Sequence, residues 1–270
     1  MEKPLLQVNN LSVRFPIRKG VFARTVGWVN AASDVSFSLA NGETLGIVGE
    51  SGSGKTTVAR SVLMLNKPSC GEILLDGKDI KKFNRQERLQ YRRDVQAVFQ
   101  DPLASLNPRF TVLEVLTEAM LVHKLVTKKT RVDEAVKLLE AVGLSSTMLD
   151  RYPHAFSGGQ RQRLCIARAL ALKPRLLICD EAVSALDLSV RAQILNLLED
   201  LKEKYSLSYL FITHDIGVVR HIADRVIVMH KGRIVEAGET EAVIGNPQNE
   251  YTKYLMAAVP EIGTPLKEEE

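Results

Sequence analysis

The chain has 270 residues, 45% of them hydrophobic and 25% charged, which excludes a disordered or fibrous protein and fits one large globular domain. Its formal net charge of +4 is too small to indicate a nucleic-acid-binding protein. The three cysteines, Cys70, Cys165 and Cys179, form no paired motif, which argues against a disulfide framework or a zinc site. Because the segment from Met1 lacks a signal pattern and no apolar run could span a bilayer, we expect a cytoplasmic protein.

The N-terminal quarter predicts strands that lead into a glycine-rich loop. Residues 5–15 alternate apolar and polar side chains in the manner of an edge strand, and residues 16–33 are expected to form a basic loop or hairpin. Residues 34–50 predict a second alternating strand, a turn and a buried strand that ends at Gly49. The spacing of apolar residues then predicts a helix over residues 56–65.

A helical block interrupts the strands in the middle of the chain. Residues 71–80 predict a strand and a turn, and residues 94–102 predict a short strand that stops at a proline. Residues 111–144 carry apolar side chains at helical spacing. We therefore expect a helical subdomain, about residues 101–157, inserted between strands of the core.

The rest of the chain alternates strands and helices. Ser157 occupies an N-cap-like position before a helix, a buried strand is expected over residues 175–181, and an amphipathic helix over residues 188–205. Residues 208–215 predict another buried strand, and residues 225–238 predict a β-hairpin. Since strands alternate with helices, the pattern predicts an α/β fold with a mostly parallel sheet that helices cover on both faces.

The glycine-rich loop matches the phosphate-binding pattern G-x-x-x-x-G-K-[ST] from Gly49 to Thr56. Glycines let successive backbone N–H groups face a phosphate, and the helix that follows adds the partial positive charge of its N-terminus. Lys55 would reach the β- and γ-phosphates, and the Thr56 hydroxyl would ligate Mg²⁺. The alternative is a glycine-rich turn without a ligand, which the flanking strand and helix argue against.

Two later segments place polar side chains where a buried strand ends, and ligand sites of parallel sheets lie at that end of the strands. Asp180 would hold Mg²⁺, and Glu181 could polarise a water for attack on the γ-phosphate. His214 also follows an apolar strand. Taken alone, the acidic pair fits a solvated turn and the histidine fits a hydrogen-bonded core residue.

The segment from Ser157 to Gln160 is a second glycine-rich helix start, but it lacks a lysine and does not follow a strand. Two such helix starts suggest that one cradles the chain's own nucleotide and the other caps nucleotide bound to a partner. Simple helix capping by Ser157 is the alternative.

Five motifs occur in order: GESGSGKTT, VFQDP, FSGGQRQR, LLICDEAVSALD and FITHD. Together they resemble the ATP-binding cassette ATPase of a membrane transporter, over nearly the whole chain. The resemblance implies a P-loop NTPase (RecA-like) core with a mostly parallel sheet, an antiparallel N-terminal β region and an inserted helical subdomain. Residues 1–240 would form the ATPase domain, and residues 241–270 a C-terminal extension of the peptide-importer type.

The resemblance also implies roles for the motif residues. The phosphate loop that binds ATP would comprise Gly49, Glu50, Ser51, Gly52, Ser53, Gly54, Lys55, Thr56 and Thr57. The catalytic residues would be the base Glu181, the switch residue His214 and the hinge residue Gln100. Mg²⁺ would be held by Thr56, Gln100 and Asp180. The signature that acts on the partner's ATP would comprise Ser157, Gly158, Gly159 and Gln160, and the dimer-communication loop Ser184, Ala185, Leu186 and Asp187.

An aromatic residue near the N-terminus is expected to stack on adenine. Phe15, at the end of the first predicted strand, matches that place best. Trp28 is the rival, because an insertion of uncertain length separates Phe15 from the core.

The segments SLNPRFTV, EAVSALDLSVRAQILNLL and NPQNEYTKYLMAAVP resemble the second ATPase subunit of oligopeptide, dipeptide or nickel importers. Phe156 and Ala182 depart from the usual leucine and proline of the family, but neither change removes a charged or phosphate-contacting group. The resemblance implies ATP and Mg²⁺ as ligands, and a peripheral position on the cytoplasmic face of the cell membrane. The implied partners are a paralogous second ATPase subunit, two permease subunits and, indirectly, an extracellular substrate-binding protein, with no nucleic acid.

Two other functions compete with a transport ATPase. The first is a soluble ABC-type ATPase of DNA repair or translation. A DNA-repair relative would carry a long coiled coil between Gln100 and Ser157, where this chain has room only for a small helical subdomain, and translation-type relatives usually carry two cassettes where this chain has one. A P-loop kinase of small metabolites does not explain the SGGQ segment or the pair of Glu181 and His214. The cargo is not legible from the sequence: peptide is the first choice and nickel or another chelated metal the second.

Overall fold

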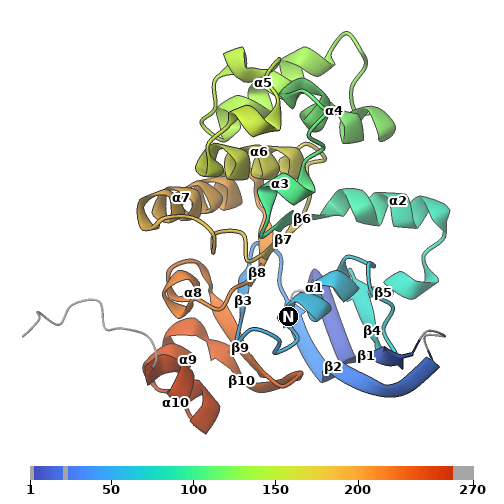
Figure 1. Ribbon diagram of the computed structural model, residues 1–270, viewed down its shortest axis with the longest axis vertical. Helices are drawn as coiled ribbons and strands as arrows, with labels where there is room; N and C mark the ends of the chain where they lie inside the picture. The colour runs from blue at the N-terminus through green and yellow to red at the C-terminus, as the bar shows by residue number, and fades with distance from the viewer. Residues whose placement is uncertain (1–2, 21–23, 258–270) are drawn as a thin grey trace, which may run out of the picture.

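The computed structural model describes residues 3–20 and 24–257, so residues 258–270 of the predicted C-terminal extension lie outside the described residues. Its strands form two sheets (Figure 1). The four-stranded sheet has the order β2-β1-β4-β5, with β1 (Leu6–Lys19), β2 (Arg24–Leu39), β4 (Cys70–Leu75) and β5 (Lys78–Asp79). The six-stranded sheet has the order β10-β9-β3-β8-β7-β6, with β3 (Thr44–Val48), β6 (Val95–Phe99), β7 (Leu176–Asp180), β8 (Ser208–Ile212), β9 (Arg225–His230) and β10 (Arg233–Glu239).

The expected α/β fold with a mostly parallel sheet is confirmed. Every neighbouring pair of the six-stranded sheet is parallel except β9 and β10, whose hairpin is antiparallel as predicted. The four-stranded sheet is antiparallel throughout. The parallel strands therefore bring their carboxyl ends to one edge, and the polar residues that follow β3, β6, β7 and β8 meet there.

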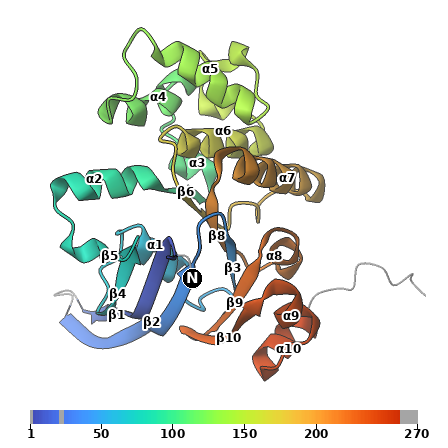
Figure 2. The ribbon, with the colours of Figure 1, turned by 180° about the vertical axis from the view of Figure 1, so that it is seen from behind.

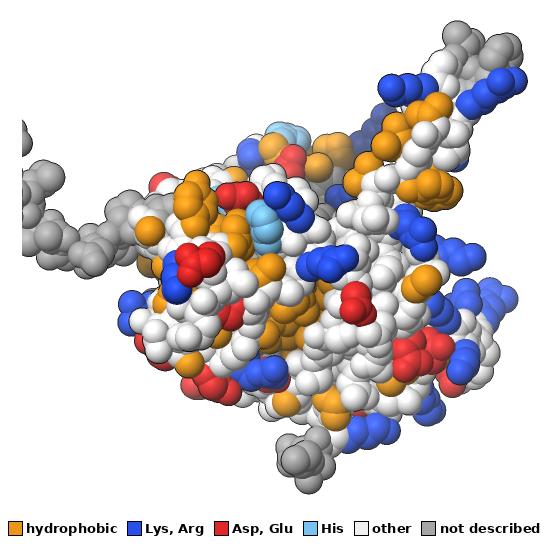
Figure 3. Space-filling view, turned by 90° about the horizontal axis from the view of Figure 1, so that it is seen from below, with side chains coloured by type: hydrophobic (Ala, Val, Ile, Leu, Met, Phe, Trp, Pro, Cys, Tyr) orange, Lys and Arg blue, Asp and Glu red, His pale blue; other side chains and the backbone are white. Residues whose placement is uncertain are grey.

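The first strand differs from its prediction. β1 is not an edge strand, because β2 pairs with one side of it and β4 with the other. The alternation of residues 5–15 reports that one face of the strand is buried, and it does not say whether one or both sides are hydrogen-bonded. Of the two structures expected for residues 16–33, the hairpin is confirmed: β1 and β2 form a long antiparallel ribbon that projects from the body of the molecule (Figure 3).

The helices lie on both sides of the six-stranded sheet (Figures 1 and 2). They are α1 (Lys55–Val62), α2 (Arg85–Asp94), α3 (Pro102–Ser105), α4 (Val112–Val122), α5 (Arg131–Ala141), α6 (Gly158–Leu170), α7 (Leu188–Tyr205), α8 (Ile216–Ile222), α9 (Thr240–Gly245) and α10 (Glu250–Ala257). Short 3₁₀ turns cover Ile80–Lys82, Ser146–Met148 and Pro153–Ala155. The helical pattern of residues 111–144 corresponds to α4 and α5, which pack against α6 at one end of the molecule.

The core divides into two layers because successive side chains of a strand point to opposite faces of its sheet. In β7, Leu177 and Cys179 join the apolar cluster beneath α4, α5, α6 and α7, whereas Leu176 and Ile178 join the cluster shared with α1 and the four-stranded sheet. Cys179 is fully buried. Burying one leucine or isoleucine side chain of this strand stabilises the fold by about 1.5–3 kcal/mol.

Helix α2 had no counterpart among the predicted elements. Its sequence is almost entirely polar and it buries only Tyr91, so it lacks the apolar stripe that predicts a helix. Its start is fixed by a capping box, in which the Asn84 side chain accepts the Glu87 N–H and the Glu87 carboxylate accepts the Asn84 N–H.

Candidate functional site

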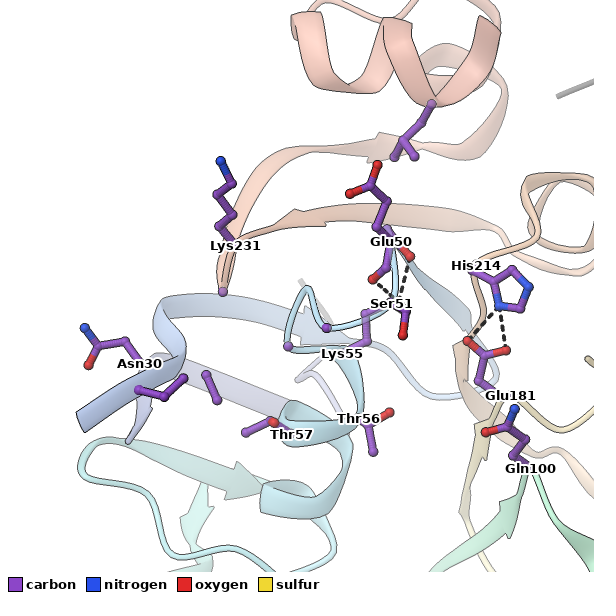
Figure 4. Close-up of a pocket in the computed structure, with 17 residues that line it drawn as sticks. Asn30, Glu50, Ser51, Lys55, Thr56, Thr57, Gln100, Glu181, His214 and Lys231 are labelled. Carbon is purple, nitrogen blue, oxygen red and sulfur yellow. Dashed lines mark hydrogen bonds and ion pairs between the residues drawn. The ribbon is translucent and has the colours of Figure 1, made fainter. Parts of the chain in front are cut away.

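The loop between β3 and α1 borders a cavity of about 750 Å³ at the carboxyl edge of the parallel strands (Figure 4). Residues from four separate predicted motifs line it together. They are Gly49, Glu50, Ser51, Gly52, Gly54, Lys55, Thr56, Thr57, Gln100, Glu181 and His214.

Two glycines allow this loop to take its shape. Gly49 has φ +147° and Gly54 has φ +105°, conformations that side-chain-bearing residues rarely adopt. A Cβ atom at Gly49 would lie 2.1 Å from the Met229 carbonyl oxygen, and one at Gly54 would lie 2.3 Å from the Ala31 carbonyl oxygen. The loop thus packs directly on the backbone of β2 and β9, and no larger residue fits at either position.

Lys55 places a buried cation inside the loop. Only 5% of its surface is exposed, and its Nζ donates to the carbonyl oxygens of Gly49 at 2.6 Å and of Glu50 at 2.8 Å. An ammonium has three donors, so one remains for an anion in the cavity. Burial lowers the pKa of Lys55, while the carboxylates of Glu181, Asp180 and Glu50 act in the opposite direction. This arrangement suits the oxygens of a polyphosphate.

Thr56 lines the cavity and bonds to Asp180, which is buried and is not among the lining residues. The Thr56 hydroxyl donates to Asp180 Oδ1 at 3.0 Å, and burial raises the pKa of the Asp180 carboxyl, with the Thr56 hydrogen bond opposing that rise. In the described part of the chain, no group of three or more His, Cys, Asp or Glu side chains could hold a metal alone. A hydroxyl, one carboxylate and the amide of Gln100 nevertheless fit Mg²⁺, which prefers oxygen ligands and completes its shell with phosphates and water.

Glu181 and His214 form a pair on the same side of the cavity as Gln100 (Figure 4). His214 Nδ1 lies 2.9 Å from Glu181 Oε1 and 2.8 Å from Oε2. Glu181 has φ +55°, a left-handed conformation that is uncommon for a residue with a side chain. The conformation is held from both sides, because the Glu181 N–H donates to the Ile212 carbonyl at 2.9 Å and the Ser184 hydroxyl donates to the Glu181 carbonyl at 2.9 Å. The backbone therefore fixes where this carboxylate points.

The signature segment lies outside the cavity lining. Ser157 caps α6: its Oγ accepts the Gln160 N–H at 3.4 Å, and Gln160 Oε1 accepts the Ser157 N–H at 3.1 Å. Ser157 and Gly158 are exposed, and a Cβ atom at Gly158 would meet no atom within 4 Å. The segment is thus a capped helix start whose surface is open to an external ligand or partner.

The loop of Ser184, Ala185, Leu186 and Asp187 connects Glu181 to α7. Asp187 caps that helix by accepting the Val190 N–H at 2.9 Å. Ala185 and Asp187 are exposed, and Leu188 directly after them is 80% exposed.

Neither aromatic candidate for adenine stacking lines the cavity. Phe15 is 41% exposed and lies opposite Val29 on the neighbouring strand, and Val29 does line the cavity. Trp28 is 60% exposed and lies opposite Pro16. Because opposed residues share a face and successive residues alternate, Phe15 lies on the face of Val29 and Trp28 on the other face.

Several lining residues were missed by sequence reasoning: Val29, Asn30, Ala31, Lys231, Gly232 and Leu255. Lys231 and Gly232 form the β9–β10 turn, and the Gly232 N–H donates to the Ser53 carbonyl at 3.0 Å. The hairpin itself was predictable, but no local pattern shows that its turn packs on the glycine-rich loop. Figure 4 places Asn30 and Lys231 on the side of the cavity away from His214.

Within residues 3–20 and 24–257, none of the helices combines the length and the apolar character that crossing a bilayer requires.

Comparisons with known proteins agree with this geometry. Residues 32–184 match a family model described as ABC transporter. The chain is 49% identical over 260 residues to the oligopeptide transport ATP-binding protein AppF of Bacillus subtilis, covering 96% of the chain and 79% of AppF. It is 52% identical over 258 residues to the glutathione import ATP-binding protein GsiA of Escherichia coli O157:H7, covering 96% of the chain but only 41% of the length of GsiA. The dimeric post-hydrolysis structure of the ATP-binding cassette MJ0796 bound to ADP and Pi has a TM-score of 0.75 and 27% identity, over 87% of this chain and 98% of that one.

Proposed function

The chain belongs to the ABC transporter family, and on that premise we propose that it hydrolyses ATP to power the import of oligopeptides or dipeptides. The observation that carries the proposal is the convergence of Lys55, Thr56 and the Glu181–His214 pair on one cavity of about 750 Å³. Asp180 is joined to this set by its hydrogen bond with Thr56. The cargo class is supported by the names of two relatives, one an oligopeptide transport protein and the other an import protein for the tripeptide glutathione.

The residues divide the chemistry among them. The loop amides and Lys55 hold the β- and γ-phosphates, and Thr56, Asp180 and Gln100 hold Mg²⁺. When bound, Mg²⁺ neutralises charge that develops on the transferred phosphoryl group. Glu181 accepts the proton of the attacking water, and His214 orients the Glu181 carboxylate and contacts the γ-phosphate.

A second subunit completes the site. ABC ATPase cassettes dimerise and work with permease subunits, and MJ0796 is a structural neighbour that was solved as a dimer. The segment Ser157, Gly158, Gly159 and Gln160, whose first two residues are exposed, closes on the partner's ATP. The loop from Ser184 to Asp187 lies across the dimer interface. The partner is a paralogous ATPase, so the two ATPase subunits form a heterodimer. This heterodimer binds two permease subunits at the cytoplasmic face of the membrane. An extracellular binding protein supplies the cargo to the permeases.

Within this proposal the domain limits are those expected from the sequence. Residues 1–240 are the ATPase domain, about residues 101–157 are its helical subdomain, and residues 241–270 are the C-terminal extension.

The cargo is tested in the assembled complex. The chain is co-expressed with its permeases and binding protein, and the ATPase rate in proteoliposomes is measured with di-, tri- and oligopeptides and with nickel chelates. Stimulation by peptides is expected. Stimulation by nickel chelates alone contradicts the peptide assignment, and a rate that does not respond to the permeases favours an ATPase unconnected with transport.

A basic groove between α2 and the end of α4 is the proposed docking site for a cytoplasmic helix of the permease. It has a volume of about 970 Å³, and its lining comprises Phe83, Arg85, Gln86, Arg88, Leu89, Arg92 and Val122. The helix that fits it carries acidic side chains opposite the arginines and apolar ones opposite Leu89 and Val122.

We expect the double variant Arg85→Glu/Arg92→Glu to lower transport at least about fivefold, because like charges then face each other across the docking site. The ATPase rate of the purified subunit, measured without permease, stays unchanged. The double variant Lys128→Glu/Lys129→Glu, on an exposed loop of the helical subdomain, changes the net charge by the same amount and serves as the charge-matched control. Equal transport by the double variant and the control contradicts the docking site.

Phe15→Ala is expected to raise KM for ATP about tenfold, or about 1.4 kcal/mol, through loss of stacking on adenine. Trp28→Ala is the matched control, because Trp28 lies on the opposite face of the same ribbon. Steady-state ATPase kinetics of the assembled complex measure both. If Trp28→Ala raises KM and Phe15→Ala does not, the adenine assignment belongs to Trp28.

A further inference from the structure

Helix α10 contacts the glycine-rich loop, although the two contacting residues are 201 positions apart in the sequence. The Tyr251 hydroxyl accepts a hydrogen bond from the Glu50 N–H at 3.1 Å, and Leu255 on the same helix lines the cavity. We infer that Tyr251 is a positioning residue for the nucleotide-binding loop: its hydroxyl holds the Glu50 peptide so that the loop keeps the shape that grips phosphate. The inference rests on the proposed nucleotide binding at this loop.

Helix α10 is anchored firmly enough to serve as a support. The Glu236 carboxylate on β10 accepts the N–H groups of Gln248 at 2.8 Å and of Asn249 at 3.1 Å, just before the helix. The Asn249 side chain in turn accepts the Tyr251 N–H at 2.9 Å and caps the first turn. The path of the chain into α10 is thereby fixed to the hairpin of β9 and β10.

Helix α10 also packs against β3, the strand that leads into the glycine-rich loop. Tyr251 and Leu255 lie against an apolar cluster that contains Val48 of β3 and Val228 of β9. Val48 immediately precedes Gly49, the first residue of the glycine-rich loop. A displacement of α10 relative to this strand would therefore act directly on the start of the loop.

The Tyr251 ring has a defined orientation. It packs on the His230 imidazole, with ring centroids 3.8 Å apart and planes tilted by 39°. Burial raises the pKa of Tyr251, so the phenol remains protonated at neutral pH. A neutral hydroxyl accepts from the Glu50 N–H without placing a negative charge beside the phosphate site.

Glu50 is held on both sides of its backbone. Its N–H donates to Tyr251, and its carbonyl oxygen accepts from Lys55 Nζ at 2.8 Å. A phosphate oxygen accepts the third donor of the Lys55 ammonium group and attracts that group toward the cavity. It does not compete for the Glu50 N–H, which is already paired with Tyr251. The Tyr251 bond therefore keeps the start of the loop in place when a phosphate binds to Lys55.

The variant Tyr251→Phe tests this inference in the full-length chain. It keeps the ring, its contact with His230 and its packing, and removes only the hydroxyl. Tyr254→Phe on the same helix is the matched control, because Tyr254 is 64% exposed. Calorimetry measures Kd for ATP and for ADP, nuclear magnetic resonance measures hydrogen exchange of the Glu50 amide, and thermal unfolding measures Tm.

We expect Tyr251→Phe to raise Kd for both nucleotides about fivefold, which is the effect of losing one hydrogen bond that preorganises the loop. Exchange of the Glu50 amide accelerates, whereas Tm stays close to that of the unmodified chain. In the assembled complex KM rises and kcat changes less than about twofold, because Tyr251 does not touch the reacting atoms.

Unchanged Kd for Tyr251→Phe overturns the inference, and so does an equal rise in the Tyr254→Phe control. A lower Tm with unchanged Kd assigns Tyr251 a purely structural role and also overturns it. The unmodified chain and Lys55→Ala are titrated in the same series. Failure of the unmodified chain to bind ATP counts against the proposed function, so the two failures are distinguishable.

Discussion

Replacing Glu181 with glutamine is expected to lower the rate of ATP hydrolysis at least about a hundredfold, while ATP binding is retained. A general base contributes roughly 10²–10⁴ to such a rate, and an amide cannot accept the proton of the attacking water. The phosphate contacts of the loop and of Lys55 remain, and an amide oxygen still accepts a hydrogen bond from His214. The substitution also keeps the size of the side chain, so the left-handed backbone at this position is unaffected.

Two measurements separate this expectation from its alternatives. Single-turnover hydrolysis in the assembled complex gives the rate, and nucleotide titration gives the affinity. Glu203→Gln, on the exposed side of α7, controls for loss of one negative charge. A Glu181→Gln complex that turns over ATP at the unmodified rate excludes Glu181 as the base.

Lys55→Ala is expected to weaken ATP binding about a hundredfold, or about 2.7 kcal/mol. A hydrogen bond from a charged donor contributes about 1.5–3 kcal/mol, and the lysine also supplies the cation nearest the phosphates. The loss has a second component, because the carbonyl oxygens of Gly49 and Glu50 no longer receive the Nζ hydrogen bonds. The loop then lacks both its cation and the two hydrogen bonds that stabilise its backbone.

Calorimetry of ATP binding with the full-length chain measures the effect. Lys67→Ala, an exposed lysine just beyond α1, is the control and should bind ATP normally. Circular dichroism shows whether the variant is folded. A folded Lys55→Ala chain with unchanged ATP affinity contradicts the role of the loop.

The sequence allowed much of the site to be predicted, because its parts are local patterns placed by a regular architecture. The phosphate-binding loop was predicted from the pattern that runs from Gly49 to Lys55 and Thr56. The position of Asp180 was predicted from the buried strand that it ends. Their convergence follows from parallel strands, whose carboxyl ends share one edge of the sheet. The buried strand expected over residues 175–181 is found as β7, whose residues are apolar on both faces up to Asp180.

Long-range contacts could not be predicted. The turn at Lys231 and Gly232, the strand residue Asn30 and the helix residue Leu255 reach the cavity from distant parts of the chain. Each lies in an element whose own pattern reports only local structure, so nothing local to it indicates the neighbour. The wrong assignment of β1 as an edge strand has the same origin, because a strand's alternation reports burial of its faces and not pairing of its sides.

Tyr251 illustrates this limit most clearly. Its partner, the Glu50 N–H, is a backbone group about 200 residues away, and no side-chain pattern encodes it. Helix α2 was missed for a different reason. With only Tyr91 buried, its helical state depends on end capping and local propensity, which periodicity does not detect.

ATP held by one chain is expected to become reactive only when the Ser157 helix start of a second subunit covers it. The direct measurement is the rate of ATP hydrolysis per chain, with the molecular mass of the species recorded in the same samples, for the purified chain alone and after addition of its partner ATPase subunit. We predict a rate near zero for the monomer that rises in proportion to the dimer formed. A strict monomer that hydrolyses ATP at the full rate of the complex would contradict this mechanism.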